Sequence, residues 1–336
     1  MHVRAFAARR PTTVCPALPK RGADGSRSDG SGYTPGMATR FRELRSDAVY
    51  WAVRGFFALG SRLPLAALRR LGTAVGATVL AIARTERARA LEHVRVAFPD
   101  LDDAGHAELV RRCAAHLGQT LGEVAWLWRA SAERVTQLCT MDGAEHLHQA
   151  REQGRGAVLV TAHCGNWELL NASLNLAGIP MTIAVRELDD PRLSLLATRL
   201  RERFGSDVVP RGVSAGRRLA RALVSNRVNG LLIDQDIRDI PSVFVPFFGR
   251  PAWTPSGAAT LALRLRCPVI PAFIHRQPDG HHHAVVHPPL PLPTGDSDED
   301  KVVELTAAAT AAIERQIRQY PEQWVWMHRR WRTRPE

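Results

Sequence analysis

A histidine and a glutamate in the segment 160–168, of sequence VTAHCGNWE, are the residues best placed to do chemistry. His163 directly follows a short apolar run, at the end of a predicted strand, where open α/β sheets hold their reactive groups. Glu168 follows His163 by five residues, and on one continuous helix that spacing would turn the two side chains about 140° apart. A turn through Gly165 removes this obstacle, so the glutamate can fold back onto the imidazole.

In that geometry the pair is suited to general base catalysis. Glu168 would accept the Nδ1 proton of His163, fix the tautomer, and leave Nε2 free to take a proton from a hydroxyl. No covalent intermediate with the protein is then required. A His-x4-Glu spacing alone does not distinguish catalysis from a structural role, and it is the position after a buried strand that favours catalysis.

The elements that must position this pair alternate along the chain. Apolar runs predict strands at 156–161, 181–185, 230–233 and 269–274. Helical spacing predicts helices at 102–138, 169–176, 190–204, 254–266 and 302–320, with another following Ser214. The alternation predicts an α/β fold with a mostly parallel sheet flanked by helices.

The N-terminal part of the chain has a different texture. Residues 1–36 are rich in Arg, Gly, Ser and Pro, which predicts a disordered extension. Residues 37–90 hold two apolar stretches, both shorter than the ~18 to 20 uninterrupted residues that a spanning helix needs. Arginines beside aromatic residues favour membrane-associated helices in this segment, and a pair of core helices is the alternative. The catalytic domain is expected in 91–336.

Composition narrows the classes of partner without selecting one. The formal charge is 45 − 33 = +12, and nearly all the basic residues are arginines, which suit phosphate-bearing partners. Five cysteines without a CxxC pair argue against a disulfide framework and against a zinc site. His281, His282 and His283 follow a turn sequence and are expected to begin a surface hairpin rather than to bind a metal.

The segment His163-Cys164-Gly165-Asn166-Trp167-Glu168 resembles the His-x4-Asp/Glu motif of glycerolipid-type acyltransferases. Its form is similar to the HxGNWE motif of the late lipid A acyltransferases of lauroyl/myristoyl type, except that Cys164 stands where that family often has an aromatic residue. Further motifs of the family recur in the same order, namely IDQD at 233–236, VPFFGRP at 245–251, TPSG at 254–257, PEQW at 321–324 and HRRW at 328–331. Together they cover about residues 42–335, and the set is far more specific than any one motif.

The resemblance implies an O-acyltransferase with a glycerolipid-acyltransferase-like fold at the cytoplasmic face of the bacterial inner membrane. It would move a fatty acyl chain from a thioester of acyl carrier protein or coenzyme A to a hydroxyl of a lipid A precursor, with His163 as general base and Glu168 as its orienter. An acidic carrier and a phosphorylated lipid both suit a basic surface. No cofactor, metal or nucleic-acid partner is expected.

The resemblance also implies which other residues bind substrate or line the cleft: Asn166, Trp167, Arg186, Asp234, Gln235 and Asp236. A turn cap remains the alternative for Asp236, and a surface salt bridge for Arg186. Arg329 and Arg330 are expected to meet lipid phosphate or the carrier protein. Backbone N–H groups near Gly165 are expected to stabilise the oxyanion.

Three alternative functions remain open at this stage. The sequence GVSAG at 212–216 matches the nucleophile elbow of serine hydrolases, with Ser214 as nucleophile, although a helix cap at Ser214 is simpler. A catalytically inactive membrane-binding module would leave the pairing of His163 and Glu168 unexplained. A phosphatidylinositol-mannoside acyltransferase shares the His-x4-acid logic and differs in its acceptor.

Overall fold

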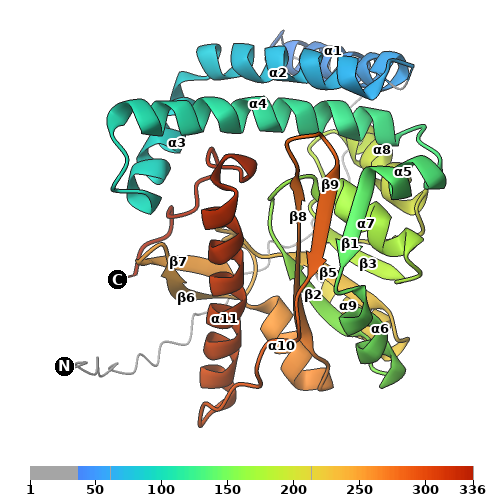
Figure 1. Ribbon diagram of the computed structural model, residues 1–336, viewed down its shortest axis with the longest axis vertical. Helices are drawn as coiled ribbons and strands as arrows, with labels where there is room; N and C mark the ends of the chain where they lie inside the picture. Colours follow the sequence, from blue (N-terminus) through green and yellow to red (C-terminus); the bar gives the residue numbers. More distant parts are fainter. Residues whose placement is uncertain (1–36, 61, 213, 336) are drawn as a thin grey trace, which may run out of the picture. The chain divides into compact units, whose positions relative to one another are not determined.

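The computed structural model describes residues 37–60, 62–212 and 214–335 (Figure 1). The chain divides into two compact units, Met1–Leu44 and Arg45–Glu336. The second unit holds the whole sheet and is described here by itself. The disordered extension predicted for 1–36 lies outside the described residues.

The helices alternate with the strands along most of the chain. In chain order the helices are α1 (Met37–Gly60), α2 (Leu65–Ile82), α3 (Arg84–Ala97), α4 (Asp103–Leu127), α5 (Ala132–Leu138), α6 (Ala144–Glu152), α7 (Trp167–Leu176), α8 (Pro191–Glu202), α9 (Ala215–Val224), α10 (Gly257–Leu265) and α11 (Asp298–Gln319), followed by a 3-10 turn at Pro321–Gln323. The strands are β1 (Cys139–Asp142), β2 (Ala157–Thr161), β3 (Met181–Val185), β4 (Asp207–Pro210), β5 (Val228–Leu232), β6 (Ser242–Phe247), β7 (Arg250–Pro255), β8 (Val269–Arg276) and β9 (His282–Val286).

A seven-stranded sheet of order β1-β9-β8-β2-β5-β3-β4 forms the centre of the unit. The strands from β8 to β4 run parallel, whereas β9 is antiparallel to β8 and β1 runs with β9. The fold is therefore the mostly parallel α/β fold that the alternation predicted. Strand β2 lies in the middle and is buried along its whole length, which explains its unbroken apolar sequence.

Alternate residues of β2 face two separate hydrophobic cores. Val158 and Val160 pack in a core with residues of α9, α10 and α11. Ala157 and Leu159 pack in a second core with residues of α5 and α7. Because successive side chains of a strand point to opposite faces, this one strand fixes both helical layers against the sheet.

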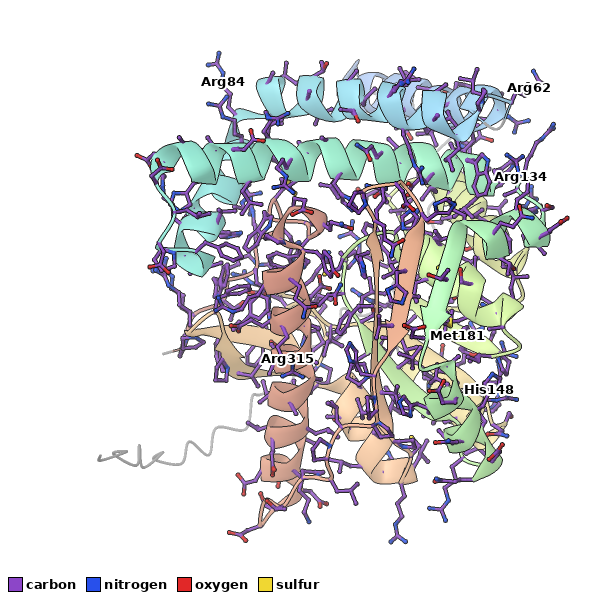
Figure 2. The ribbon with its side chains drawn as sticks, in the orientation of Figure 1. Arg62, Arg84, Arg134, His148, Met181 and Arg315 are labelled. Carbon is purple, nitrogen blue, oxygen red and sulfur yellow. The ribbon has the colours of Figure 1, made fainter. Side chains whose placement is uncertain are left out.

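Helix α2 packs directly on α4, along which it lies in Figure 1. A Cβ atom on Gly72 would overlap the backbone carbonyl of Gly118, and a Cβ on Gly118 would overlap that of Gly72. Glycines at this crossing let the two backbones touch. Among the described residues α2 is the one helix long and apolar enough to cross a membrane, and arginines project at both of its ends, Arg62 and Arg84 (Figure 2). Membrane association of the segment 37–90 stays a prediction.

Three local predictions differ from the structure. The helix predicted at 102–138 is broken into α4 and α5, because Ser131 caps a new helix by accepting from the Arg134 N–H. Thr254 and Pro255 end strand β7 rather than begin a helix, and α10 starts only at Gly257. The hairpin at 281–286 is confirmed, but His282 at its start is buried rather than exposed.

Candidate active site

The catalytic histidine predicted from the sequence lies beside an aspartate from the neighbouring strand. Thr161 at the end of β2 pairs with Leu232 at the end of β5, and His163 and Asp234 each come two residues later. The parallel register thus brings the two residues to equivalent positions at the carboxyl edge of the sheet. The Nδ1 atom of His163 lies 2.8 Å from Asp234 Oδ1.

Three donors hold the carboxylate of Asp234 in place. Besides the imidazole, the backbone N–H of His163 donates to Oδ2 at 2.9 Å and the indole N–H of Trp324 donates to the same oxygen at 2.8 Å. Burial by itself raises the pKa of Asp234, but the contacts with His163 and Trp324 outweigh it and lower the pKa to about 2. A charged carboxylate only accepts, so Nδ1 carries the proton and Nε2 is left as the basic nitrogen.

Glu168 does not contact the imidazole, so the geometry predicted for it is wrong. Its carboxylate accepts from the guanidinium of Arg201 on α8, with Nε 3.0 Å from Oε2 and Nη2 2.5 Å from Oε1. The reason is local, because Glu168 lies in the first turn of α7, which begins at Trp167, and its side chain meets α8. Whether Glu168 takes part in catalysis stays a prediction.

The imidazole of His163 opens onto a cavity of about 660 Å³. The ring of Trp167 meets the imidazole of His163 edge to face, with the ring centroids 5.0 Å apart. The amide nitrogen of Gln235 lies 3.3 Å from Nδ1 and 3.4 Å from Nε2 of the imidazole. Apolar side chains from β3, β5, α8 and the connection between β3 and α8 line much of the cavity, among them Ile183, Ala184, Leu188, Leu195, Ala197 and Leu232. Its shape and lining suit a substrate with one apolar and one polar part.

Three arginines also line the cavity, and they differ in their partners. Arg201 is paired with Glu168, as described. Arg186 and Arg211 lie close enough that burial and the charge of Arg186 together lower the pKa of Arg211. Within the described ranges neither has an acidic group at ion-pair distance. Glu187 and Asp189 line the cavity as well, but the two neighbouring guanidinium groups make this part of its wall suited to an anion.

Three of the predicted substrate-binding residues are used inside the protein. Asn166 is fully buried and caps α7 by accepting from the Leu169 N–H. Asp236 is buried and accepts from the backbone N–H of Thr333 at 2.6 Å. Arg330 is fully buried and donates to the carbonyl of Trp253 at 2.7 Å. Each of these three side chains is thus engaged within the protein, and contact with substrate stays a prediction for them. Arg329 is exposed.

The expected oxyanion donor at Gly165 is also engaged. Its backbone N–H donates to the carbonyl of Gln323 at 2.8 Å. The residue has a φ of +59°, and a Cβ atom there would overlap the carbonyl of Ile274. Glycine is needed for the turn and for this close approach, rather than for a free N–H.

A buried ionic network, which the sequence analysis missed, lies behind the motif. The carboxylate of Glu123 on α4 contacts Arg69 at 2.7 Å, Arg276 at 2.8 Å and His282 at 3.1 Å. Its second oxygen accepts from the Asn166 side chain at 2.9 Å. These five residues, called the Glu123 network below, connect α2, α4, β8 and β9 to the residue that caps α7.

The serine of the elbow-like sequence is poorly placed for nucleophilic catalysis. Ser214 precedes α9, is exposed, and makes no capping hydrogen bond, so the helix cap predicted for its side chain is wrong. It does not line the cavity that His163 faces. Among the described residues no group of three or more His, Cys, Asp or Glu is placed to hold a metal ion, and a reaction without metal or cofactor stays a prediction.

Comparisons with known proteins agree with the resemblance. The family model for bacterial lipid A biosynthesis acyltransferases matches residues 34–333. The lipid A biosynthesis lauroyltransferase of Escherichia coli (strain K12) is 28% identical over 289 residues, or 85% of this chain and 92% of that protein. The palmitoleoyltransferase of the same organism is 26% identical over 290 residues, covering 85% and 91%. The phosphatidylinositol mannoside acyltransferase of Mycolicibacterium smegmatis is 30% identical over 229 residues, covering 67% and 72%.

Proposed function

The chain belongs to the bacterial lipid A biosynthesis acyltransferase family, and from this premise we propose that it moves a fatty acyl chain from a thioester to a hydroxyl of a lipid A precursor. The proposed donor is acyl carrier protein or coenzyme A, and the proposed site of action is the cytoplasmic face of the inner membrane. The observation that carries the proposal is the 2.8 Å contact between His163 and Asp234 at the wall of the cavity.

In the proposed reaction His163 acts as general base. Asp234 holds the Nδ1 proton, so Nε2 can take the proton of the acceptor hydroxyl as its oxygen attacks the thioester carbonyl. The tetrahedral intermediate then collapses, the C–S bond breaks, and the imidazolium returns its proton to the departing thiolate. The buried carboxylate stabilises the positive charge that His163 carries between these two steps.

The two sides of the cavity suit the two parts of the proposed acceptor. Arg186 and Arg211 would bind a phosphate of the lipid, which would supply the ion-pair partner that neither arginine has among the described residues. The apolar lining from β3 and α8 would hold hydrocarbon, where each buried methylene contributes about 0.8 kcal/mol. Arg201 on α8 would face the reacting groups, and its ion pair with Glu168 would hold the guanidinium in position.

A second acceptor is favoured by one specific observation. The relative with the highest identity among those described above is named for a phosphatidylinositol mannoside, which also carries a phosphate and acyl chains. The same two arginines could bind that phosphate. The catalytic proposal is unchanged, and only the acceptor differs.

Mass spectrometry of lipid A tests both parts of the proposal. The host should lack its own late acyltransferase and should express wild type, His163→Ala or, as a matched control at an exposed histidine outside the cavity, His281→Ala. An added acyl mass with wild type and His281→Ala, absent with His163→Ala, is expected. Unchanged lipid A with wild type would move the proposal to the mannoside acceptor, which purified protein and labelled thioester can check. Acylation by His163→Ala would contradict the role of His163.

A further inference from the structure

A second basic surface lies outside the cavity, near the C-terminal end of the described chain. Arg238, Trp253, Arg332, Thr333 and Arg334 surround an open, shallow depression of about 520 Å³, called the Arg238 patch below. In Figure 1 the C-terminus lies beside β6 and β7, and Trp253 belongs to β7. Residues 325–335 contain four arginines and no aspartate or glutamate.

Hydrogen bonds made by two buried side chains, Asp236 and Arg330, fix the backbone of this patch. Asp236 accepts from the Thr333 N–H at 2.6 Å and from its hydroxyl at 3.0 Å. Arg330, itself buried, donates to the Trp253 carbonyl at 2.7 Å. The patch is therefore a defined surface, with the guanidinium groups of Arg238 and Arg334 exposed on it.

The patch lies close to the catalytic pair along the chain. Asp234 contacts His163, Gln235 lines the cavity, Asp236 anchors Thr333, and Arg238 belongs to the patch. Four residues of fully extended chain span at most about 14 Å, so the patch begins within that distance of the catalytic aspartate. A partner seated on the patch would therefore contact the chain within about 14 Å of Asp234.

The composition of the patch fits a soluble acidic partner better than a membrane. None of its residues is a large exposed hydrophobic, whereas α2 exposes Leu71, Val75, Val79 and Ile82. A surface that inserts into a lipid interface needs such apolar side chains beside its arginines. Asp236 pairs with Arg332 at 3.4 Å, so the uncompensated positive charge of the patch comes from Arg238, which Asp239 follows in sequence, and from Arg334.

The open form of the patch also argues against a small ligand. Sites for small molecules enclose most of the ligand, whereas Arg238 and Arg334, which have no ion-pair partner among the described residues, are exposed on a shallow surface. Exposed charges of this kind steer and orient a protein partner of opposite charge.

We propose that the Arg238 patch is the docking surface for an acidic carrier protein that delivers the acyl thioester to His163. This inference rests on the proposed acyl transfer and adds the place where the donor binds. The acyl thioester, on a flexible arm of the carrier, would enter the cavity from the side of Gln235.

Two donors with the same acyl chain, one on acyl carrier protein and one on coenzyme A, separate docking from chemistry. The variant Arg238→Glu with Arg334→Glu reverses two exposed charges. The control variant Arg155→Glu with Arg221→Glu makes the same change at exposed arginines near the opposite edge of the sheet, since Arg155 precedes β2 whereas His163 follows it. With the protein donor we expect kcat/KM of the patch variant to fall at least about fivefold, and with the coenzyme A donor to stay within about twofold.

The outcomes distinguish this inference from the proposed function. Equal losses with both donors, no loss with either, or an equal loss in the control variant would overturn the docking surface while leaving acyl transfer intact. Wild type that uses only coenzyme A would also overturn it. Loss of binding to vesicles of anionic lipid, with unchanged carrier kinetics, would assign the patch to the membrane instead. Wild type that transfers from neither donor would overturn the proposed function itself.

Discussion

Two clusters of charged residues each include members of the motif at 163–168, and they differ in how far their side chains are exposed to solvent. The cavity cluster consists of His163, Asp234, Glu168 and Arg201, and the His163 and Arg201 side chains are 23% and 20% exposed. In the Glu123 network the carboxylate is 1% and His282 0% exposed. The first cluster keeps polar atoms available to a ligand, whereas the second uses its polar atoms inside the protein.

This difference separates two roles that sequence motifs do not distinguish. A charge on a cavity wall can be changed with little loss of packing, so its substitution should alter rate or binding. A sealed charge has no solvent to replace its partner, so its substitution should alter stability first. Asp234 is the exception in the cavity cluster, because it is 2% exposed but contacts the imidazole of His163, so its substitution should alter both rate and stability. Asn166 shows the contrast, because it belongs to the motif by sequence and to the Glu123 network by contact.

The largest effect is expected on the rate of Asp234→Asn. The amide cannot stabilise the imidazolium and can favour the wrong tautomer, so kcat should fall roughly 10³- to 10⁴-fold. Steady-state kinetics with purified protein measure this. Asp236→Asn makes the same chemical change two residues away, at a side chain that anchors Thr333, and should keep kcat within a few-fold. Equal losses in the two variants would contradict the assignment of Asp234 to His163.

The next largest effect is expected on the stability of Glu123→Ala. Removing the carboxylate leaves Arg69, Arg276 and the Asn166 amide without their buried partner, which should lower the free energy of unfolding by about 3 to 5 kcal/mol. Denaturant unfolding measures the loss, and Glu123→Gln should lose less because it keeps one acceptor. A variant of normal stability and low kcat would place Glu123 with the cavity cluster.

The pH dependence of stability should come from His116, a buried histidine that contacts Arg276 of the Glu123 network. Burial, and then the charge of Arg276, lower the pKa of His116 to about 3, and its Nδ1 lies 2.6 Å from the guanidinium. The neutral imidazole takes up a proton on unfolding below about pH 6.5, so stability falls as the pH falls from there towards 3. One such group contributes a slope of up to about 1.4 kcal/mol per pH unit. His116→Gln should flatten the curve of unfolding free energy against pH, and an unchanged slope would contradict this.

A smaller effect tests the paired charges of the cavity. If Glu168 acts by holding Arg201, then Glu168→Gln and Arg201→Gln should each lower kcat about tenfold, and the double variant should be no worse than either one. A double-variant cycle in kcat measures the coupling. Independent losses that multiply would instead give Glu168 its own role in the reaction.

Most of the fold could be predicted because its strands are local patterns. Strand β2 is an apolar run whose length and ends are visible in sequence, and β8 is another. The hairpin of β6 and β7 could not be predicted in the same way, because Val245 pairs with Ala252 across a turn and the sequence Thr254-Pro255 also fits a helix start. The pairing of β6 with β7 in the folded protein decides between a strand and a helix start at 254–255, both of which are acceptable locally.

The candidate site was predictable in its residues and less so in their pairing. His163 and Asp234 were both named from sequence, but they are 71 residues apart and only the register of β2 with β5 brings them together. Glu168 was paired with His163 because it is near in sequence. Arg201 and Arg211 carry no local signal, since an arginine on an amphipathic helix or after an edge strand is ordinary in this chain.

The smallest effect is expected at Arg186 and Arg211, the two cavity arginines that have no ion-pair partner among the described residues. Among the described residues Arg186 and Arg211 have no acidic group at ion-pair distance, although Glu187 and Asp189 also line the cavity, so removing either arginine should cost little stability. Arg186→Ala and Arg211→Ala should each raise KM for a phosphorylated acceptor about tenfold with little change in kcat, since one charge-assisted hydrogen bond contributes about 1.5 kcal/mol. Thermal stability should stay the same or rise. With an acceptor that lacks the phosphate, KM should not differ between wild type and the variants. A fall in kcat without a rise in KM would mean that these arginines act on the reacting groups.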